Sequence, residues 1–323
     1  MLNKLKGKEI RDKLSEELAL QKKDDLIVKP LNLKHIKESG LNFLVDDVDE
    51  KRFSLFNLSD DDKLYLSSSY FLSLIVKEKL SEKIININNS NIHLTIHAHS
   101  NSSLNLILLA DSDSSLFVEA FLDSSSFVRL TILSKSGSMM TRFYSNCKEN
   151  ARFEAINFSS ASLNSFSKST LSSDSSCYIA NSYFNKDSSS KSNDVVIHSG
   201  KNTKSLITSR GYLVNSKSDF RGLIKIEPSA FDSQGFQESA VLLEGNSKAI
   251  SVPDLEILNN EVKCSHGSTI SRIKDEDLFY FESRGISKST ARFILIEGHL
   301  LSLLPDDSSV RERAKSLLEG VFL

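Results

Sequence analysis

The hydrophobic and polar positions in the middle of the chain follow a repeating pattern that begins at about Lys83. A cluster of Ser, Asp and Asn residues is followed by about six residues in which apolar and polar side chains alternate. The first residues after successive clusters are Leu104, Leu116, Phe127, Met139, Ala151 and Leu163, at steps of 12, 11, 12, 12 and 12 residues. Alternation with period 2 predicts β-strands, and the regular step predicts one strand and one turn in each unit.

Two such units form a coil of about 24 residues, which suits a parallel β-helix built from stacked coils. A Ser-rich segment can also be disordered, but its regular apolar alternation argues against disorder. A β-sandwich is the serious alternative, because its strands also recur every 8–12 residues. The near-constant spacing and the shortage of Gly-containing hairpin turns favour the solenoid. We therefore predict a mainly β protein with a parallel β-helix core over residues 83–272.

The alternation also predicts which side chains face the inside of the coil. In two well-defined units, the predicted inward residues are Leu116, Val118, Ala120, Val128, Leu130 and Ile132. The residues between them that we expect to face water are Glu119, Arg129 and Thr131.

The sequence on either side of this core has helical features. Residues 1–82 are predicted to form a helical or mixed α/β cap, starting with an amphipathic helix over residues 2–20. Residues 273–323 are predicted to form a helical segment with helices over residues 275–284, 287–304 and 308–322. Ser309 is the predicted N-cap of the last helix, because Glu312 three residues later would complete a capping box. A solenoid needs such caps, since strand edges are left open at its ends.

Charge and composition limit the classes of partner. The chain has 40 basic and 42 acidic residues, so no broad basic surface favours nucleic acid. Its three cysteines, Cys147, Cys177 and Cys264, do not make a disulfide framework, and the first two are expected to be small core or surface residues of repeat strands. No segment has the pattern of a secretory leader or a bilayer-spanning helix. We therefore expect a cytoplasmic protein that binds neither nucleic acid nor membrane.

Two short motifs carry weaker signals of chemistry. His93, His97 and His99 share one face of a predicted strand, but His93 would lie about 20 Å from His99 along it. An outward polar face is therefore a better interpretation than a zinc site. Residues 199–202, Ser-Gly-Lys-Asn, are similar to the end of a phosphate-binding loop. The first Gly and the final Ser or Thr of that loop are missing, so we expect no nucleotide site there.

The sharpest candidate is the pair Cys264 and His266, two residues apart in a segment with strand alternation. On a strand their side chains project to the same face. A thiol and an imidazole there can hold a soft metal or a sulfur species, although two ligands do not complete a site. The alternative is a buried thiol and a hydrogen-bonded core histidine. We rank His266 above Cys264, because burial would raise the thiol pKa and make the sulfur unreactive.

A set of ordered motifs surrounds this pair. Those upstream are residues 209–211 (SRG), 220–226 (FRGLIKI) and 230–237 (AFDSQGFQ). Those around and after it are residues 251–257 (SVPDLEI), 262–269 (VKCSHGST), 277–280 (DLFY) and 283–286 (SRGI). Together they resemble the SufB/SufD family of the SUF iron–sulfur cluster assembly system. The Cys-Ser-His-Gly form is typical of the SufD branch of that family.

The resemblance implies a parallel β-helix with helical ends and a scaffold role in cluster assembly, without enzymatic activity. It implies that a SufC-like ATPase docks on the C-terminal helical segment, where the apolar candidates are Leu278, Phe281, Ile294, Leu295 and Leu317. It also implies pairing through the β-helix, either with a SufB-like protein or with a second copy of this chain.

The same resemblance places His266 at the interface with the partner, near a partner cysteine, where a transient iron–sulfur cluster would form. No cofactor is expected to be stably bound by this chain alone. SufB contributes a carboxylate from its following helix, whereas residues 290–293 of this chain read Thr-Ala-Arg-Phe. The site on this chain is therefore expected to be incomplete.

Two other functions are alternatives. A β-helix protein that acts on or binds carbohydrate would need carboxylate and basic groups on one face, for which Asp219 and Arg221 are a weak candidate. A purely structural homodimer is the other. Co-purification with an ATPase would separate the scaffold from both.

Overall fold

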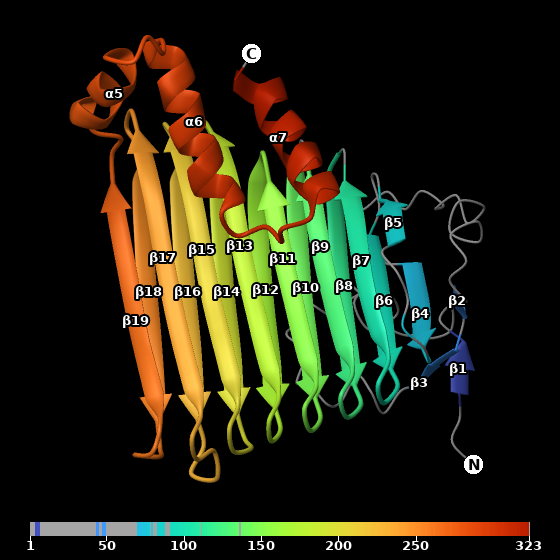
Figure 1. The fold of residues 1–323 in the computed structure, drawn as a ribbon. Helices are drawn as coiled ribbons and strands as arrows, with labels where there is room; N and C mark the ends of the chain where they lie inside the picture. Colours follow the sequence, from blue (N-terminus) through green and yellow to red (C-terminus); the bar gives the residue numbers. More distant parts are fainter. Residues whose placement is uncertain are drawn as a thin grey trace, which may run out of the picture.

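The computed structural model describes residues 4–6, 43–44, 47–49, 70–77, 79, 83–87, 91–110, 112–135 and 137–322. Within these residues, strands coil into a parallel β-solenoid that is followed by three helices (Figure 1). Successive strands alternate between two facing sheets. The mainly β fold with a solenoid core is therefore confirmed.

The two sheets consist of even-numbered and odd-numbered strands. The nine-stranded sheet contains β2 (Phe43–Leu44), β4 (Tyr70–Val76), β6 (Asn91–Ala98), β8 (Ser114–Leu122), β10 (Ser138–Cys147), β12 (Ser162–Leu171), β14 (Ser189–His198), β16 (Lys217–Ile226) and β18 (Lys248–Ile257). The eight-stranded sheet contains β5 (Lys83–Asn86), β7 (Ser103–Ala110), β9 (Phe127–Ser134), β11 (Arg152–Ser159), β13 (Ser176–Lys186), β15 (Lys204–Val214), β17 (Gln234–Glu244) and β19 (Lys263–Ser271). All neighbours pair in parallel except β2 and β4, which are antiparallel.

The strand register confirms the coil length expected from the sequence. Met139 of β10 pairs with Leu163 of β12, 24 residues later. Farther along, Lys204 of β15 pairs with Gln234 of β17, so the later coils are longer by about six residues. Parallel pairing already includes β4, which precedes Lys83. The division into segments 1–82, 83–272 and 273–323 stays a prediction.

The turns explain the abundance of Ser, Asn and Asp. At one end of the coils, a residue with φ between 53° and 62° recurs in each turn, and these residues are Asn101, Ser125, Asn150, Asp174, Asn202 and Asp232. Asn and Asp tolerate this left-handed region better than most residues. A hydroxyl then closes several of the turns: Ser126 Oγ, for example, donates to Asp123 O at 2.7 Å. Polar side chains thus stabilise these turns, in place of the Gly and Pro residues that are common in other turns.

The interior of the solenoid combines an apolar core with a buried polar layer. Leu, Ile, Val and Phe side chains fill most of the space between the sheets. In the middle coils the interior also contains polar side chains around Asp194. This residue accepts hydrogen bonds from Ser167 Oγ at 2.6 Å and from Asn181 Nδ2 at 2.8 Å. Burial raises the pKa of Asp194 to about 7. Cys177 lies in the same interior, where burial raises its pKa to about 12.

Three helices follow the last strand: α5 (Asp275–Glu282), α6 (Lys288–Leu301) and α7 (Ser308–Phe322). All three were predicted from the sequence, and Ser287 caps α6 by accepting a hydrogen bond from the Thr290 N–H. The predicted cap of α7 is wrong, because Ser309 lies inside the helix. Asp307 is the cap instead, since its Oδ1 accepts from the Ser309 N–H at 2.8 Å.

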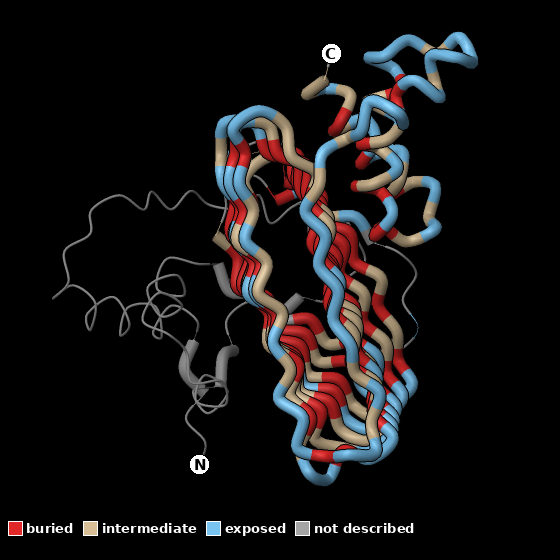
Figure 2. Tube along the Cα trace, turned by 90° about the vertical axis from the view of Figure 1, so that its left-hand side faces the viewer, coloured by how far each residue is buried: buried red, intermediate tan, exposed pale blue. Residues whose placement is uncertain are grey.

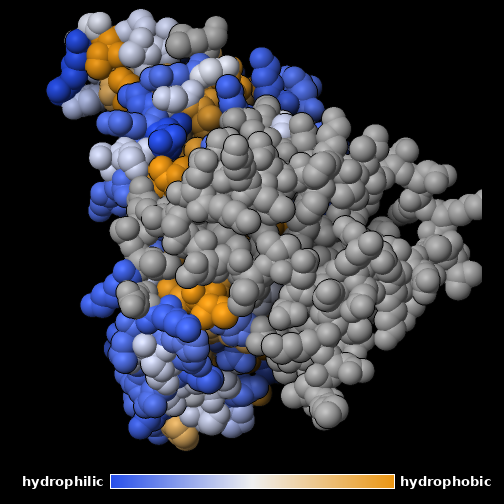
Figure 3. Space-filling model, turned by 90° about the vertical axis from the view of Figure 1, so that its right-hand side faces the viewer, coloured by the Kyte–Doolittle hydropathy of each residue, from blue (hydrophilic) through white to orange (hydrophobic). Residues whose placement is uncertain are grey.

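Helices α6 and α7 cover the outer face of the eight-stranded sheet near the C-terminal ends of its strands (Figure 1), and they form a second apolar core with it. The sheet contributes Ile107, Leu133, Ile156, Phe158, Ala180, Phe184 and Tyr212, and the helices contribute Ile296, Leu300, Leu301, Val310, Ala314 and Leu318. Seen from the β4 side, apolar side chains remain visible among hydrophilic ones on the helical segment at the top (Figure 3). None of the helices described has the length and apolar character that crossing a bilayer requires.

Two residues expected to face water are buried. Glu119 has 1% of its surface exposed and Thr131 has none, although both lie on the outer face of their sheet. Alternation assigns a side chain to a face, but it does not say whether that face is covered. Thr131 lies on β9, which contacts α7. Glu119 Oε2 lies 2.7 Å from His93 Nε2, so its carboxyl group has a buried hydrogen-bond partner.

The expected N-terminal helix is contradicted where the chain is described. Lys4–Lys6 forms strand β1, which pairs antiparallel with β3 (Asp47–Asp49). Pairing with a strand distant in sequence satisfies these backbone groups, and a local helical period cannot anticipate it. The rest of residues 2–20 lies outside the described residues.

Candidate functional site

The last coil of the solenoid, formed by β18 and β19, differs from the middle coils. Each of these strands is the terminal member of its sheet and has a neighbour on one side only among the described strands. No residue of either strand is fully buried, and the coil stands exposed in front of the buried coils in Figure 2. We call this surface the terminal coil.

Large apolar side chains are exposed on and beside the terminal coil. They are Ile250, Ile257, Leu258 and Ile270, with between 43% and 58% of their surface accessible. An open strand edge with exposed apolar residues is the usual template for pairing with another chain. The arrangement therefore suits a docking surface that continues the solenoid.

Cys264 and His266 both lie on β19, in this terminal coil. In the register they stand next to Gly235 and Gln237 of β17. Because they are two residues apart on a strand, their side chains leave the same face, as predicted. The structure thus brings the two candidate ligands together, but it gives them different environments.

The Cys264 thiol is half-buried against the apolar interior. Gly235 leaves room for Ile224 beside the thiol, since a Cβ there would come within 2.8 Å of Ile224 Cγ2 but would only touch Cys264 Sγ, at 3.5 Å. Burial raises the pKa of Cys264, while a hydrogen bond with the Gly235 backbone partly lowers it. The thiol therefore stays protonated at neutral pH in this state.

The His266 side chain is exposed on the terminal coil. Its imidazole is available to a ligand or to a partner that docks on this end of the solenoid. Across the described part of the chain, no group of three or more His, Cys, Asp and Glu side chains is placed to hold a metal ion. The pair itself offers at most two ligands.

The five apolar positions predicted for ATPase docking have unequal exposure. Leu278 is 1% exposed and packs inside the helical segment, whereas Phe281, Leu295 and Leu317 are half-buried. Ile294 is 39% exposed. Helical spacing selected these positions, and spacing alone cannot separate the inner from the outer face of a short helix.

The most exposed aromatic residues of the helical segment were missed from the sequence. Phe279 and Tyr280 on α5 have 70% and 55% of their surface accessible. The DLFY motif could have indicated this exposure, because three successive apolar or aromatic residues cannot all face one side of a helix. Arg284 stacks on the Tyr280 ring, with its guanidinium carbon 4.3 Å from the ring centroid.

Helix α6 is held to the solenoid by a polar anchor. Arg292 Nη1 donates to Glu244 Oε2 at 2.5 Å, and the Tyr212 hydroxyl donates to the same carboxylate. On the same helix, burial lowers the pKa of His299 to about 4, with a smaller effect from Arg210. Helix α6, which contacts α5, is therefore attached to the sheet.

The weaker candidates take structural positions. His93 is buried against Glu119 and Phe117, while His99 is exposed and pairs with Asp123 at 3.7 Å. Residues 199–202 form the turn between β14 and β15, without the following helix of a phosphate-binding loop.

The remaining candidates are also structural. Asp219 and Arg221 form an exposed ion pair at 3.1 Å. Cys147 and Cys177 are core residues.

The fold and the terminal coil together define a class: a parallel β-solenoid with an exposed terminal coil and a helical segment anchored to one face. Residues 82–299 match the family described as "SUF system FeS cluster assembly, SufBD core domain". This match covers most of the solenoid, all of α5 and most of α6. The chain belongs to the SufBD family, which confirms the resemblance found in the sequence.

Individual relatives agree with this assignment. A SufBD family protein ycf24 from Antithamnion sp. is 37% identical over 153 residues, which is 45% of this chain and 50% of the relative. The Escherichia coli protein SufD is 37% identical over 94 residues, or 29% of this chain and 21% of the relative. A chloroplastic SufBD family protein of Arabidopsis thaliana, ABCI8, is 31% identical over 44% of this chain and 26% of the relative. The chain thus spans half or less of the length of these curated relatives.

Proposed function

We propose that this protein is a SufD-like scaffold component of the SUF iron–sulfur cluster assembly machinery. It would act with a SufB-type partner and a SufC-type ATPase in the cytoplasm, and it would have no catalytic activity of its own. The observation that carries the proposal is the terminal coil, where an exposed imidazole and a half-buried thiol lie on the open edge of a SufBD-family solenoid.

The SufB-type partner would dock on the terminal coil. The outer edges of β18 and β19 have no strand partner among the described residues, and the four exposed apolar residues of this surface offer area that docking would remove from water. The partner could then extend one or both sheets by strand addition.

The cluster is the cargo of this site. In the proposed complex, His266 supplies an imidazole nitrogen to iron, and the partner supplies the remaining ligands. Cys264 has a secondary role, because its thiol must lose its proton and leave the apolar interior before it can bind iron. A rearrangement of the interface driven by the ATPase would expose it.

The SufC-type ATPase would dock on the helical segment through Phe279, Tyr280 and Ile294. These three side chains are exposed on α5 and α6, and the polar anchor attaches α6, which contacts α5, to the solenoid. Rigid exposed aromatic residues are frequent energetic centres of protein interfaces.

The ligand role is tested with His266→Ala in the assembled complex. Iron and sulfide loading is measured anaerobically, and the amount of assembled complex is matched beforehand. We expect loading to fall strongly while the melting temperature and the assembly stay the same, because His266 is exposed and packs little. Ser268→Ala is the matched control, since Ser268 is exposed on the same face of β19.

Equal loading by His266→Ala and wild type would refute the ligand role. A loss of loading that occurs only in step with a loss of assembly would show instead that His266 holds the interface together.

The ATPase surface is tested with Phe279→Ser combined with Tyr280→Ser, in a pull-down with the purified ATPase subunit. Deleting the whole helical segment is a poorer test, because it would expose the second core on the sheet. We expect the double variant to lose binding and to keep its fold. The control is Ser302→Ala, an exposed residue at the far end of α6. Undiminished binding by the double variant would rule out this surface.

A further inference from the structure

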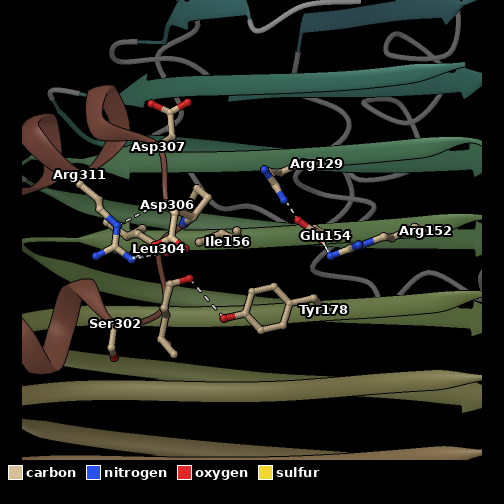
Figure 4. A pocket seen from close by; sticks show the side chains of 12 residues that line it. Arg129, Arg152, Glu154, Ile156, Tyr178, Ser302, Leu304, Asp306, Asp307 and Arg311 are labelled. Carbon is tan, nitrogen blue, oxygen red and sulfur yellow. Dashed lines mark hydrogen bonds and ion pairs between the residues drawn. The ribbon is translucent and has the colours of Figure 1, made fainter. Parts of the chain in front are cut away.

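A pocket of about 760 Å³ lies away from both proposed interfaces, between the eight-stranded sheet and the segment that joins α6 to α7 (Figure 4). Its sheet wall contains Arg129, Arg152, Glu154 and Tyr178, from β9, β11 and β13. Its other wall contains residues 302–307 and Arg311. Its volume is in the range of pockets that hold small molecules.

Two arginines on the sheet wall share one buried carboxylate. Arg129 Nε donates to Glu154 Oε2 at 2.5 Å, and Arg152 Nη2 donates to Glu154 Oε1. The Glu154 side chain is only 3% exposed, whereas those of Arg129 and Arg152 are 26% and 60% exposed. Two guanidinium groups and one carboxylate leave a net charge of +1 on this wall.

The two guanidinium groups are held in place as well as charged. Both lie over the ring of Phe127, with their central carbons 5.3 Å and 5.5 Å from its centroid. Each guanidinium carries five N–H donors and uses few of them in these contacts, so donors remain available toward the pocket. A rigid fork of this kind loses little conformational entropy when it binds a ligand.

The opposite wall carries one arginine and two aspartates, which give it a net charge of −1. Arg311 donates to Asp306 Oδ1 at 2.9 Å and to the carbonyl oxygens of Leu304 and Pro305. Asp307 caps the N-terminus of α7, where the helix dipole favours its charge. Tyr178 is neutral, since burial raises its pKa to about 12, and its hydroxyl donates to Leu303 O at 3.3 Å. The charges of the whole pocket therefore sum to zero, and the positive side is the sheet wall, where Arg129 and Arg152 face one carboxylate.

We propose that Arg129 and Arg152 form a binding site for a phosphate group, with Glu154 as the residue that positions them. A tetrahedral phosphate can accept hydrogen bonds from both forks at once, and arginine pairs suit such recognition. The site is independent of the terminal coil and of the α5 surface. A ligand bound there would contact both the sheet and the segment that joins α6 to α7.

The probe is inorganic phosphate, added at constant ionic strength against potassium chloride. Binding is followed by NMR through the Nε–H resonances of the arginine side chains of the full chain. We expect a saturable shift in wild type and a dissociation constant about tenfold or more higher in Arg152→Gln, because one charged donor group is lost. Arg152→Gln leaves Arg129 beside Glu154, so the buried carboxylate keeps a partner.

Two further variants make the result decisive. Arg129→Lys keeps a positive charge near Glu154 but removes the fork, and it is expected to weaken binding as well. Arg221→Gln, at an exposed arginine of the other sheet, is the control and should bind phosphate like wild type. A linear, non-saturating response in wild type would overturn the proposal, and so would equal affinities in Arg152→Gln and Arg221→Gln.

A second titration uses phosphoserine. Binding of both ligands would assign the site to a phosphate group carried by a larger molecule, and binding of inorganic phosphate alone would assign it to the free ion.

Discussion

The middle coils of the solenoid and its terminal coil are built from the same alternating pattern, yet the side chains of the middle coils are largely buried and those of the terminal coil are not. In β12 and β13 even Ser, Asn and Cys side chains are buried, because the next coil covers each strand. In β18 and β19 no side chain is fully buried, and isoleucines face solvent. Both regions follow the period of a strand, so the pattern itself does not create the difference.

The difference comes from whether a neighbouring coil exists. In the middle, each added coil supplies backbone partners and apolar contacts at once, which is how a solenoid accumulates stability. At the end, the same groups lack a neighbour within the described chain and form a surface that can pair with another chain. One repeating pattern therefore gives a rigid body in the middle and a docking site at the edge.

The largest expected effect tests the middle coils. Phe153→Ala should lower the free energy of unfolding by about 3–5 kcal/mol, because Phe153 is fully buried between the sheets and the change leaves a cavity. Chemical denaturation of the isolated chain measures it. Ile250→Ala in the terminal coil should change stability by less than about 0.5 kcal/mol, since this residue is half exposed.

The same two variants reverse their order in binding. Ile250→Ala should weaken association with the partner that docks on the terminal coil, whereas Phe153→Ala should not affect it at temperatures where the variant is folded. A large stability loss from Ile250→Ala in the isolated chain would contradict the contrast between the two regions.

The next effect concerns the buried polar layer of the middle coils. Burial raises the pKa of Asp194 from 3.8 to about 7, so the folded state keeps a proton that the unfolded state releases. Its contribution to stability is fully present below about pH 4 and is lost as the pH rises through 7. Relative to the non-titrating variant Asp194→Asn, wild type should lose up to about 4 kcal/mol over this range.

The measurement compares unfolding free energies of wild type and Asp194→Asn at several pH values. Taking the difference removes His198, which has the opposite sign: burial lowers its pKa to about 4, so its contribution falls as the pH falls. Asp219→Asn, at a solvent-exposed ion pair, is the control and should change stability by less than about 0.5 kcal/mol throughout. A difference that does not vary with pH would show that Asp194 is ionised in the folded state.

Much of the fold could be predicted from the sequence, because strand period and repeat length are local properties. The steps of 11 and 12 residues fixed the coil length, and Ser287 marked the start of α6. The placement of Cys264 and His266 on one strand also followed from their spacing. Each of these rests on neighbours in the chain.

The features that could not be predicted depend on contacts between residues on different strands or helices. Glu119 meets His93 from 26 residues away, and Asp194 meets Asn181 across the interior. The exposure of Phe279 depends on how α5 lies against α6. Alternation gives the side of a strand on which a residue lies, but the cover on that side comes from another part of the fold.

The smallest predicted effect comes from a substitution in one turn of the middle coils. Ser125 has a φ of 60°, in a stack where the other positions hold Asn or Asp. Because Asn adopts the left-handed region more readily than Ser, Ser125→Asn should raise the unfolding free energy by about 0.5 kcal/mol. Thermal unfolding measures the change, and Ser124→Asn is the matched control, since Ser124 does not have a positive φ. Equal shifts from the two variants would mean that backbone conformation does not select the residue in these turns.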